Sequence, residues 1–92
     1  MGKFFFNNKL VLKPGHCYSI YEWDGWRHYE ILSKYKIMWN GKLRTKYTIR
    51  IIMLKNNKVV TIPYVTKDFI KDSFRGKKYK RVDKSIIAKA LL

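Results

Sequence analysis

The sequence predicts a small, mainly β domain, and two observations carry that prediction. Pairs of turn-forming residues recur about sixteen residues apart, at Asp24-Gly25, Asn40-Gly41 and Asn56-Asn57. Such residues tolerate the positive φ angles of tight hairpin turns. The segments between them alternate apolar and polar side chains, which is the period of a strand with one buried face. We therefore expect a meander of antiparallel strands joined by short loops.

The meander is expected to hold four strands, with a fifth and shorter strand before it. The four strands should span roughly residues 16–23, 26–38, 42–54 and 58–65. The short strand should lie around residues 9–12, and the Pro14-Gly15 turn should connect it to the meander.

The register of each hairpin follows from the rule that residues opposite each other in a ladder share a face. Two-residue loops at the first and third turns place apolar residues together, with Trp23 opposite Trp26 at the first. The same loop at the middle turn would place Ile37 opposite Arg44, so that charged side chains would share the apolar face. We therefore expect a loop of odd length there, with Gly41 in the left-handed region as a bulge residue.

The pattern changes after Val65, where a short helix and a basic C-terminal extension are expected. Thr66 is a suitable N-cap, the apolar side of the helix would plug the sheet, and Gly76 would end it. The densest basic run of the chain follows at residues 75–81. Residues 83–92 carry a narrow apolar stripe that would form a second short helix. This helix would either dock on the sheet or pair with a second copy or another partner.

The charge of the chain points to a polyanionic partner. Lys and Arg number 21 against 6 Asp and Glu, a formal net charge of +15, although 47% of the residues are hydrophobic. A folded domain with such an excess repels itself, and a polyanion would neutralise it. Nucleic acid is the favoured partner, with duplex above single strand. An acidic protein surface is the alternative, and no membrane partner is expected.

In this register, basic side chains of the two central strands point away from the core, beside an aromatic cluster at the first hairpin. Basic side chains contact phosphates, and planar rings stack on bases at about 1–3 kcal/mol per base. Trp39, at the tip of the second hairpin, would insert between base steps or fold back over the core. A solvated basic face and a solubilising tail are the alternatives. The expected binding residues are Lys34, Lys36, Lys42, Arg44, Lys46, Arg50, Trp23, Trp26, Trp39, Arg75, Lys77, Lys78, Lys80 and Arg81.

One stretch of the chain carries a resemblance to a known class of folds. Lys13-Pro14-Gly15-His16-Cys17-Tyr18-Ser19-Ile20 leads into Trp26-Arg27-His28-Tyr29-Glu30-Ile31. This order of a turn, a strand, a short hairpin and an aromatic strand resembles an SH3-like barrel of the Tudor, KOW or small archaeal chromatin-protein type. The resemblance covers roughly residues 9–74 and implies a five-stranded barrel with a short plug helix that acts as a binding module. We therefore divide the chain into a barrel domain at 1–74 and a basic extension at 75–92.

No catalytic, metal or cofactor site is expected. The sequence has no paired-carboxylate, Ser-His-Asp or Cys-His constellation and no glycine-rich phosphate loop. His16, Cys17 and His28 lack the spacing of a zinc site. The single cysteine, with no apolar run of signal or membrane length, predicts a cytoplasmic protein. We expect a non-enzymatic, sequence-tolerant nucleic-acid-binding protein. The alternative is a small phage-type effector that inhibits a host protein, such as a polymerase or a defence nuclease, through its acidic surface.

Overall fold

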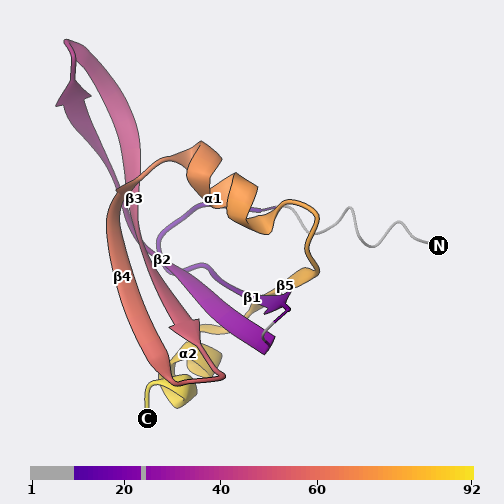
Figure 1. The fold of residues 1–92 in the computed structure, drawn as a ribbon. Coiled ribbons are helices and arrows are strands. Elements are labelled where there is room, and N and C mark those ends of the chain that lie inside the picture. The colour runs from indigo at the N-terminus through magenta and orange to yellow at the C-terminus, as the bar shows by residue number, and fades with distance from the viewer. Residues whose placement is uncertain (1–9, 24) are drawn as a thin grey trace.

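An antiparallel sheet of five strands forms the centre of the computed structural model, which describes residues 10–23 and 25–92. The strands are β1 (Cys17–Glu22), β2 (Gly25–Trp39), β3 (Lys42–Met53), β4 (Lys58–Val65) and β5 (Tyr79–Val82). Their order across the sheet is β4-β3-β2-β1-β5 (Figure 1). The mainly β fold and the four-stranded meander predicted from the sequence are confirmed.

The fifth strand lies in the C-terminal basic run and not before the meander. Residues 10–12 form no strand, and Lys9 lies outside the described residues. β5 pairs with β1, with Cys17 opposite Val82. The edge strands β4 and β5 do not pair with each other in the described part of the chain. The sheet is therefore open, and the expected closure into a barrel is wrong.

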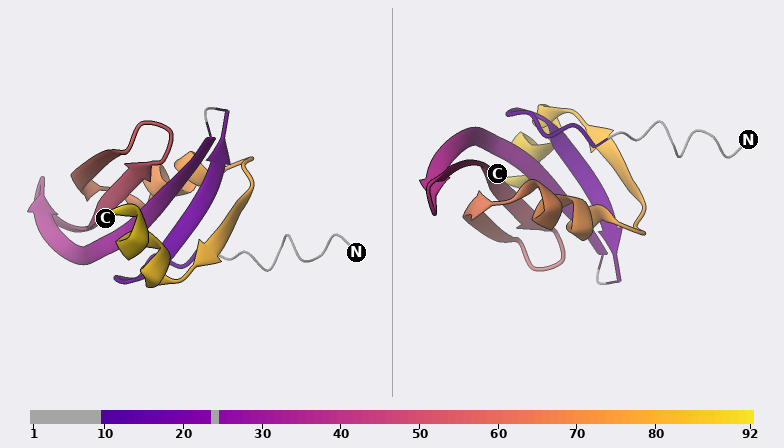
Figure 2. Two further views of the ribbon diagram at one scale, coloured as in Figure 1. Left: turned by 90° about the horizontal axis from the view of Figure 1, so that it is seen from below. Right: turned by 90° about the horizontal axis from the view of Figure 1, so that it is seen from above.

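Two helices cover opposite faces of the sheet. α1 (Lys67–Phe74) lies on one face and α2 (Lys84–Ala90) on the other, as the two views of Figure 2 show. Thr66 caps α1 as predicted, since its Oγ1 accepts a hydrogen bond of 3.1 Å from the backbone N–H of Phe69. The C-terminal helix thus docks on its own chain, which is the first of the two arrangements expected for it.

Each helix covers an apolar cluster. The larger cluster, on the α1 side, contains Leu12, Tyr18, Ile20, Tyr29, Ile31, Tyr47, Ile49, Val65, Ile70 and Phe74. On the α2 side, Ile87 packs with Cys17 and Ile52. That face of the sheet also buries three polar residues, Ser19, His28 and Glu30. The face that the sequence predicted to be open to solvent is therefore partly covered.

The first and third hairpins keep the predicted faces but shift in register by two residues. Tyr21 pairs with Trp26, the residue that was expected opposite Trp23. Met53 pairs with Lys58, so the third loop has four residues where two were expected. Because side chains alternate with a period of two, an even shift leaves the side chains on their predicted faces. The exception is the end of β4, where the register shifts again between Ile62 and Val65 and Tyr64 is exposed.

The middle hairpin corrects the predicted loop. Asn40 and Gly41 have φ angles of 49° and 76°, and they form a two-residue turn of type I′. The extra residue that the apolar pattern required lies within β2 instead, as a bulge at Leu32 where the register shifts between Ile31 and Ser33. Beyond a one-residue bulge, each later side chain of the strand lies on the opposite face. The bulge therefore decides where the basic residues of β2 point.

Candidate nucleic-acid interface

The part of the β2–β3 hairpin beyond the bulge, residues 33–46, is a two-stranded arm. β4 pairs with β3 only between Tyr47 and Met53, so no third strand accompanies the arm in the described structure. Figure 1 shows it extending past α1 and past the end of β4. Its two faces carry different residues, and each is a candidate contact surface.

One face of the arm forms a groove with β4. Ile37 and Trp39 from β2, Lys46 from β3 and Tyr64 from β4 line a cavity of about 410 Å³. This volume is in the range of small-molecule sites, about 300–1,000 Å³. Trp39 and Tyr64 are 59% and 62% exposed, so much of each ring is accessible to a ligand.

The position of Tyr64 follows from an irregularity at the end of β4. Its φ angle of 58° lies in the left-handed region, which is uncommon for a residue other than glycine. The Tyr64 N–H donates a hydrogen bond of 2.9 Å to Oη of Tyr35, and the two rings meet edge to face with centroids 6.0 Å apart. The sequence analysis missed Tyr64 and Ile37. Pro63 within a predicted strand was the available signal, because proline marks bulges and edges.

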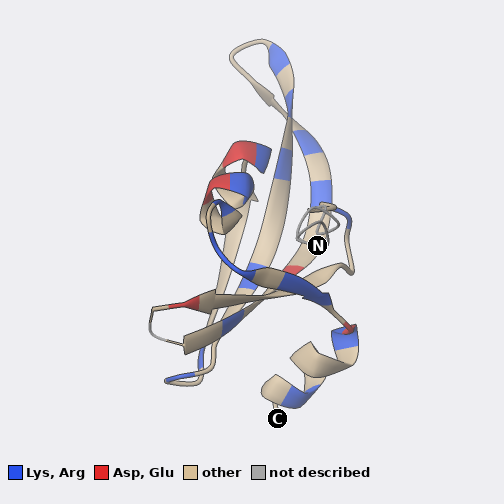
Figure 3. Cartoon of the chain, turned by 90° about the vertical axis from the view of Figure 1, so that its right-hand side faces the viewer, with Lys and Arg blue, Asp and Glu red and all other residues tan. Residues whose placement is uncertain are grey.

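Three of the predicted basic residues form a cation row beside the groove: Lys42, Arg44 and Lys46. They occupy alternate positions of β3 and pair directly with three β2 residues, Trp39, Ile37 and Tyr35. Alternate residues of a strand lie about 6.4–6.8 Å apart. Within residues 10–23 and 25–92, no ion pair involves any member of the row. Figure 3 shows Lys and Arg recurring along the arm.

Lys34 and Lys36 lie on the other face of the arm, which corrects the prediction of a single basic face. The bulge at Leu32 separates them from the cation row. Their face also carries Met38 and Leu43, which pair with each other and are both exposed. The arm is therefore basic on both faces, and only the face with the groove is also aromatic.

Arg50 was predicted from the sequence to bind phosphates, but in the structure its guanidinium is held by a carboxylate. It pairs directly across the strands with Glu30, which is buried. Its Nη2 and Nε donate hydrogen bonds of 2.6 and 3.1 Å to the same carboxylate oxygen of Glu30. A buried carboxylate without its cation would be costly. Arg50 is thus a structural partner of Glu30.

The predicted aromatic cluster at the first hairpin is only partly assembled. Trp26 contacts Tyr21 edge to face at 5.3 Å, and the ammonium of Lys80 lies 5.5 Å from the Trp26 ring centroid. Trp23 is 88% exposed at the turn, and His28 is buried. Tyr21, Trp23 and Trp26 are therefore accessible at this hairpin, and the Trp26 ring already lies beside a cation.

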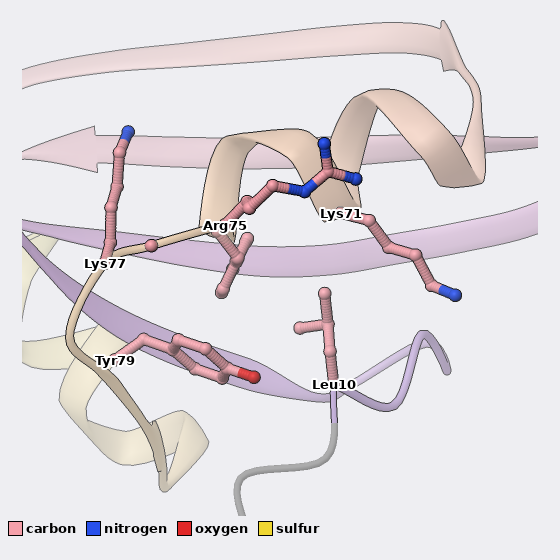
Figure 4. Close-up of a pocket in the computed structure, with 7 residues that line it drawn as sticks. Leu10, Lys71, Arg75, Lys77 and Tyr79 are labelled. Atoms are coloured by element: carbon pink, nitrogen blue, oxygen red, sulfur yellow. The ribbon is translucent and has the colours of Figure 1, made fainter. Parts of the chain in front are cut away.

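A second pocket, of about 390 Å³, lies between the end of α1 and β5 and includes predicted basic residues. Figure 4 shows the Tyr79 ring extending toward Leu10, with Lys71 and Arg75 on the α1 side. Arg75 forms an ion pair with Asp72 at 2.9 Å, and Lys77 forms one with Glu22 at 2.8 Å. Two of its three cations already have carboxylate partners, so this pocket is a weaker anion site than the arm.

Of the remaining basic residues of the run, Lys78 precedes β5 and Arg81 lies within it. Lys78 and Arg81 are exposed. The Nη2 atom of Arg81 lies 3.5 Å from Nε2 of His16, a contact that leaves the guanidinium accessible. These residues can extend a basic surface along the sheet edge but lie apart from the groove.

Ser19 and His28 form a buried polar pair on the α2 side of the sheet. Oγ of Ser19 lies 2.7 Å from Nδ1 of His28, directly across the β1–β2 ladder. Burial lowers the pKa of His28 below its ordinary value of 6.5, because desolvation disfavours the charged imidazolium. The unfolded chain therefore binds this proton more readily than the folded chain.

We expect the melting temperature to be highest above about pH 6.5 and to fall as the pH drops through the interval between 6.5 and the lower folded pKa. Thermal melts between pH 8 and pH 4.5 would measure this. The His28→Gln variant, which retains a hydrogen-bonding group opposite Ser19, should have a flatter profile. An equally steep profile for the variant would assign the pH dependence to other groups, such as His16, whose pKa is also lowered, first by burial.

Comparison with known proteins assigns the chain to no family. No family model, no curated protein and no solved structure matches the chain. The SH3-like resemblance therefore has no support from relatives, and the fold is a small open antiparallel sheet. Among residues 10–23 and 25–92, no three His, Cys, Asp or Glu residues gather into a metal site. No helix in the same part of the chain is long and apolar enough to cross a membrane.

Proposed function

We propose that this protein is a non-enzymatic nucleic-acid-binding protein that is largely tolerant of sequence, with the arm as its main contact surface. The observation that carries the proposal is the cation row beside the aromatic groove. Three cations that form no ion pair with the described carboxylates lie along one strand, next to two accessible rings. Cations neutralise phosphates and rings stack on bases, which are the two contacts that sequence-tolerant binding requires.

Exposed basic residues outside the cation row also support binding to nucleic acid. Lys34 and Lys36 on the second arm face, with Lys78 and Arg81 near β5, bring the available cations to the number needed for about five to eight phosphate contacts. Phosphate contacts carry no sequence information. A distant relation to SH3-like binding modules is part of the proposal, and it rests on a five-stranded antiparallel sheet with α1 directly after β4.

The first test is binding to short duplex DNA, single-stranded DNA and duplex RNA, measured by fluorescence anisotropy across a salt series. For about five to eight contacts, the slope of log K against log salt should be roughly −4 to −7 on duplex DNA. Dissociation constants above about 0.1 mM for every nucleic acid at physiological salt would contradict the proposal, because non-specific binders usually fall at or below that value.

A second candidate function is binding to an acidic protein surface, as a phage-type effector would do. The exposed pair of Met38 and Leu43, on the same arm face as Lys34 and Lys36, favours it, because interface cores combine apolar contact with a polar rim. Such a protein would bind one partner in a salt-dependent way and would not bind polyanions in general. The salt series above separates the two functions.

A further inference from the structure

The groove between the arm and β4 combines exposed rings, an apolar side chain and a cation. Ile37 and Lys46 line the same cavity as two accessible rings, Trp39 on the arm and Tyr64 at the end of β4. Flat rings that remain exposed beside an apolar residue offer a stacking surface to any base, since every base has a π face. The backbone of Tyr64 is held in place by its hydrogen bond to Tyr35.

A duplex cannot use this groove without opening. Within a duplex the faces of each base are covered by its stacked neighbours, and moving one base out costs a few kcal/mol. Unpaired bases offer their faces at no such cost. A groove with rings from two strands therefore favours single-stranded nucleic acid, in contrast to the duplex preference expected from the sequence.

The cation row gives the phosphates a path beside the bases. Lys42, Arg44 and Lys46 follow β3 at about 6.4–6.8 Å intervals, and neighbouring strands lie about 4.7–4.9 Å apart. A sugar-phosphate backbone lying along β3 would thus place its bases over β2 and β4, where the rings are. Lys46 belongs to both the row and the groove, so it connects the two contacts.

We propose that the groove lined by Ile37, Trp39, Lys46 and Tyr64 stacks an unpaired base of a single-stranded nucleic acid while Lys42, Arg44 and Lys46 neutralise its phosphates. The inference rests on the proposed function and specifies its ligand. Single-stranded DNA and single-stranded RNA offer the same base and phosphate chemistry to these residues. The experiment therefore includes both.

The test measures anisotropy with labelled dT12, labelled U12 and a 12-base-pair DNA duplex at one salt concentration. The wild-type protein should bind at least one single strand about tenfold or more tightly than the duplex. Trp39→Leu and Tyr64→Leu keep an apolar side chain but remove the ring, and each should weaken single-strand binding about 5- to 150-fold. Duplex binding should change less than twofold. Phe69→Leu, the same change on an exposed ring of α1, is the matched control and should bind like the wild type.

The outcomes separate this inference from the proposed function. If the wild type binds none of the three probes, the proposed function fails and this inference fails with it. If the wild type binds but prefers the duplex, or if both ring variants bind single strands as the wild type does, only the groove assignment is overturned. Circular dichroism checks the fold of each variant. If Tyr64→Leu does not fold because of the left-handed backbone at this position, the single-strand affinity of Trp39→Leu, at the exposed tip, tests the groove assignment by itself.

Discussion

Arg50→Glu is expected to lower the free energy of unfolding by about 3–5 kcal/mol, which would unfold much of the protein. The Glu30 carboxylate is buried, and its partner in the structure is the guanidinium of Arg50 at 2.6 Å. The variant removes this cation and places a second carboxylate beside the first. Two such charges in a poorly solvated site repel each other strongly. Urea unfolding followed by circular dichroism would measure the loss.

Two variants test the cause of that loss. Lys46→Glu reverses a charge on the same face of the same strand, four positions away, at a residue with no ion-pair partner in the described part of the chain. It should therefore change stability by less than about 1 kcal/mol. The double variant Glu30→Leu with Arg50→Leu removes both charges and should lose much less than Arg50→Glu alone. If Arg50→Glu unfolds at the same urea concentration as Lys46→Glu, the ion pair does not support the fold.

Ile87→Ala is expected to cost about 2–5 kcal/mol of stability. Ile87 is only 2% exposed and packs α2 against Cys17 and Ile52 on the sheet. Truncation removes apolar contact and leaves a cavity under a helix of only seven residues, which has few other contacts to hold it. Thermal and urea unfolding at neutral pH would measure the difference from the wild type.

The adjacent residue provides a matched control. Ile86 is 36% exposed, so Ile86→Ala should cost well under half as much as Ile87→Ala. If α2 instead joined two chains, stability would rise with protein concentration. Melting temperatures that increase over a hundredfold range of concentration, or a larger loss for Ile86→Ala, would contradict docking of α2 on its own sheet.

The sequence predicted the strands well because the turn residues and the alternation act locally. It also indicated correctly that the middle hairpin needs one residue more than a two-residue loop allows. It could not locate that residue, because a bulge within a strand and a longer loop restore the same apolar pattern. Asn40 and Gly41 favour a two-residue turn with positive φ angles, so the extra residue lies at Leu32.

The candidate site was less predictable than the fold, since three of its features depend on contacts distant in sequence. Lys34 and Lys36 changed face because of the bulge, and Arg50 was assigned to solvent although Glu30 is its cross-strand partner. Tyr64 joins the groove only through the irregular end of β4. The strand β5 was missed because four residues with mixed polarity carry no clear alternation.

The arm has a further consequence for how copies of this protein behave at high concentration. Along residues 33–46, each strand has one side without a neighbouring strand in the described structure, so backbone N–H and C=O groups remain open to a strand from another molecule. Such edges promote aggregation unless charge opposes it. Lys34, Lys36, Lys42 and Lys46 place positive charge along both strands, and a second arm laid alongside would carry the same charge. We therefore expect the lysines to oppose the joining of open edges as long as no polyanion neutralises them.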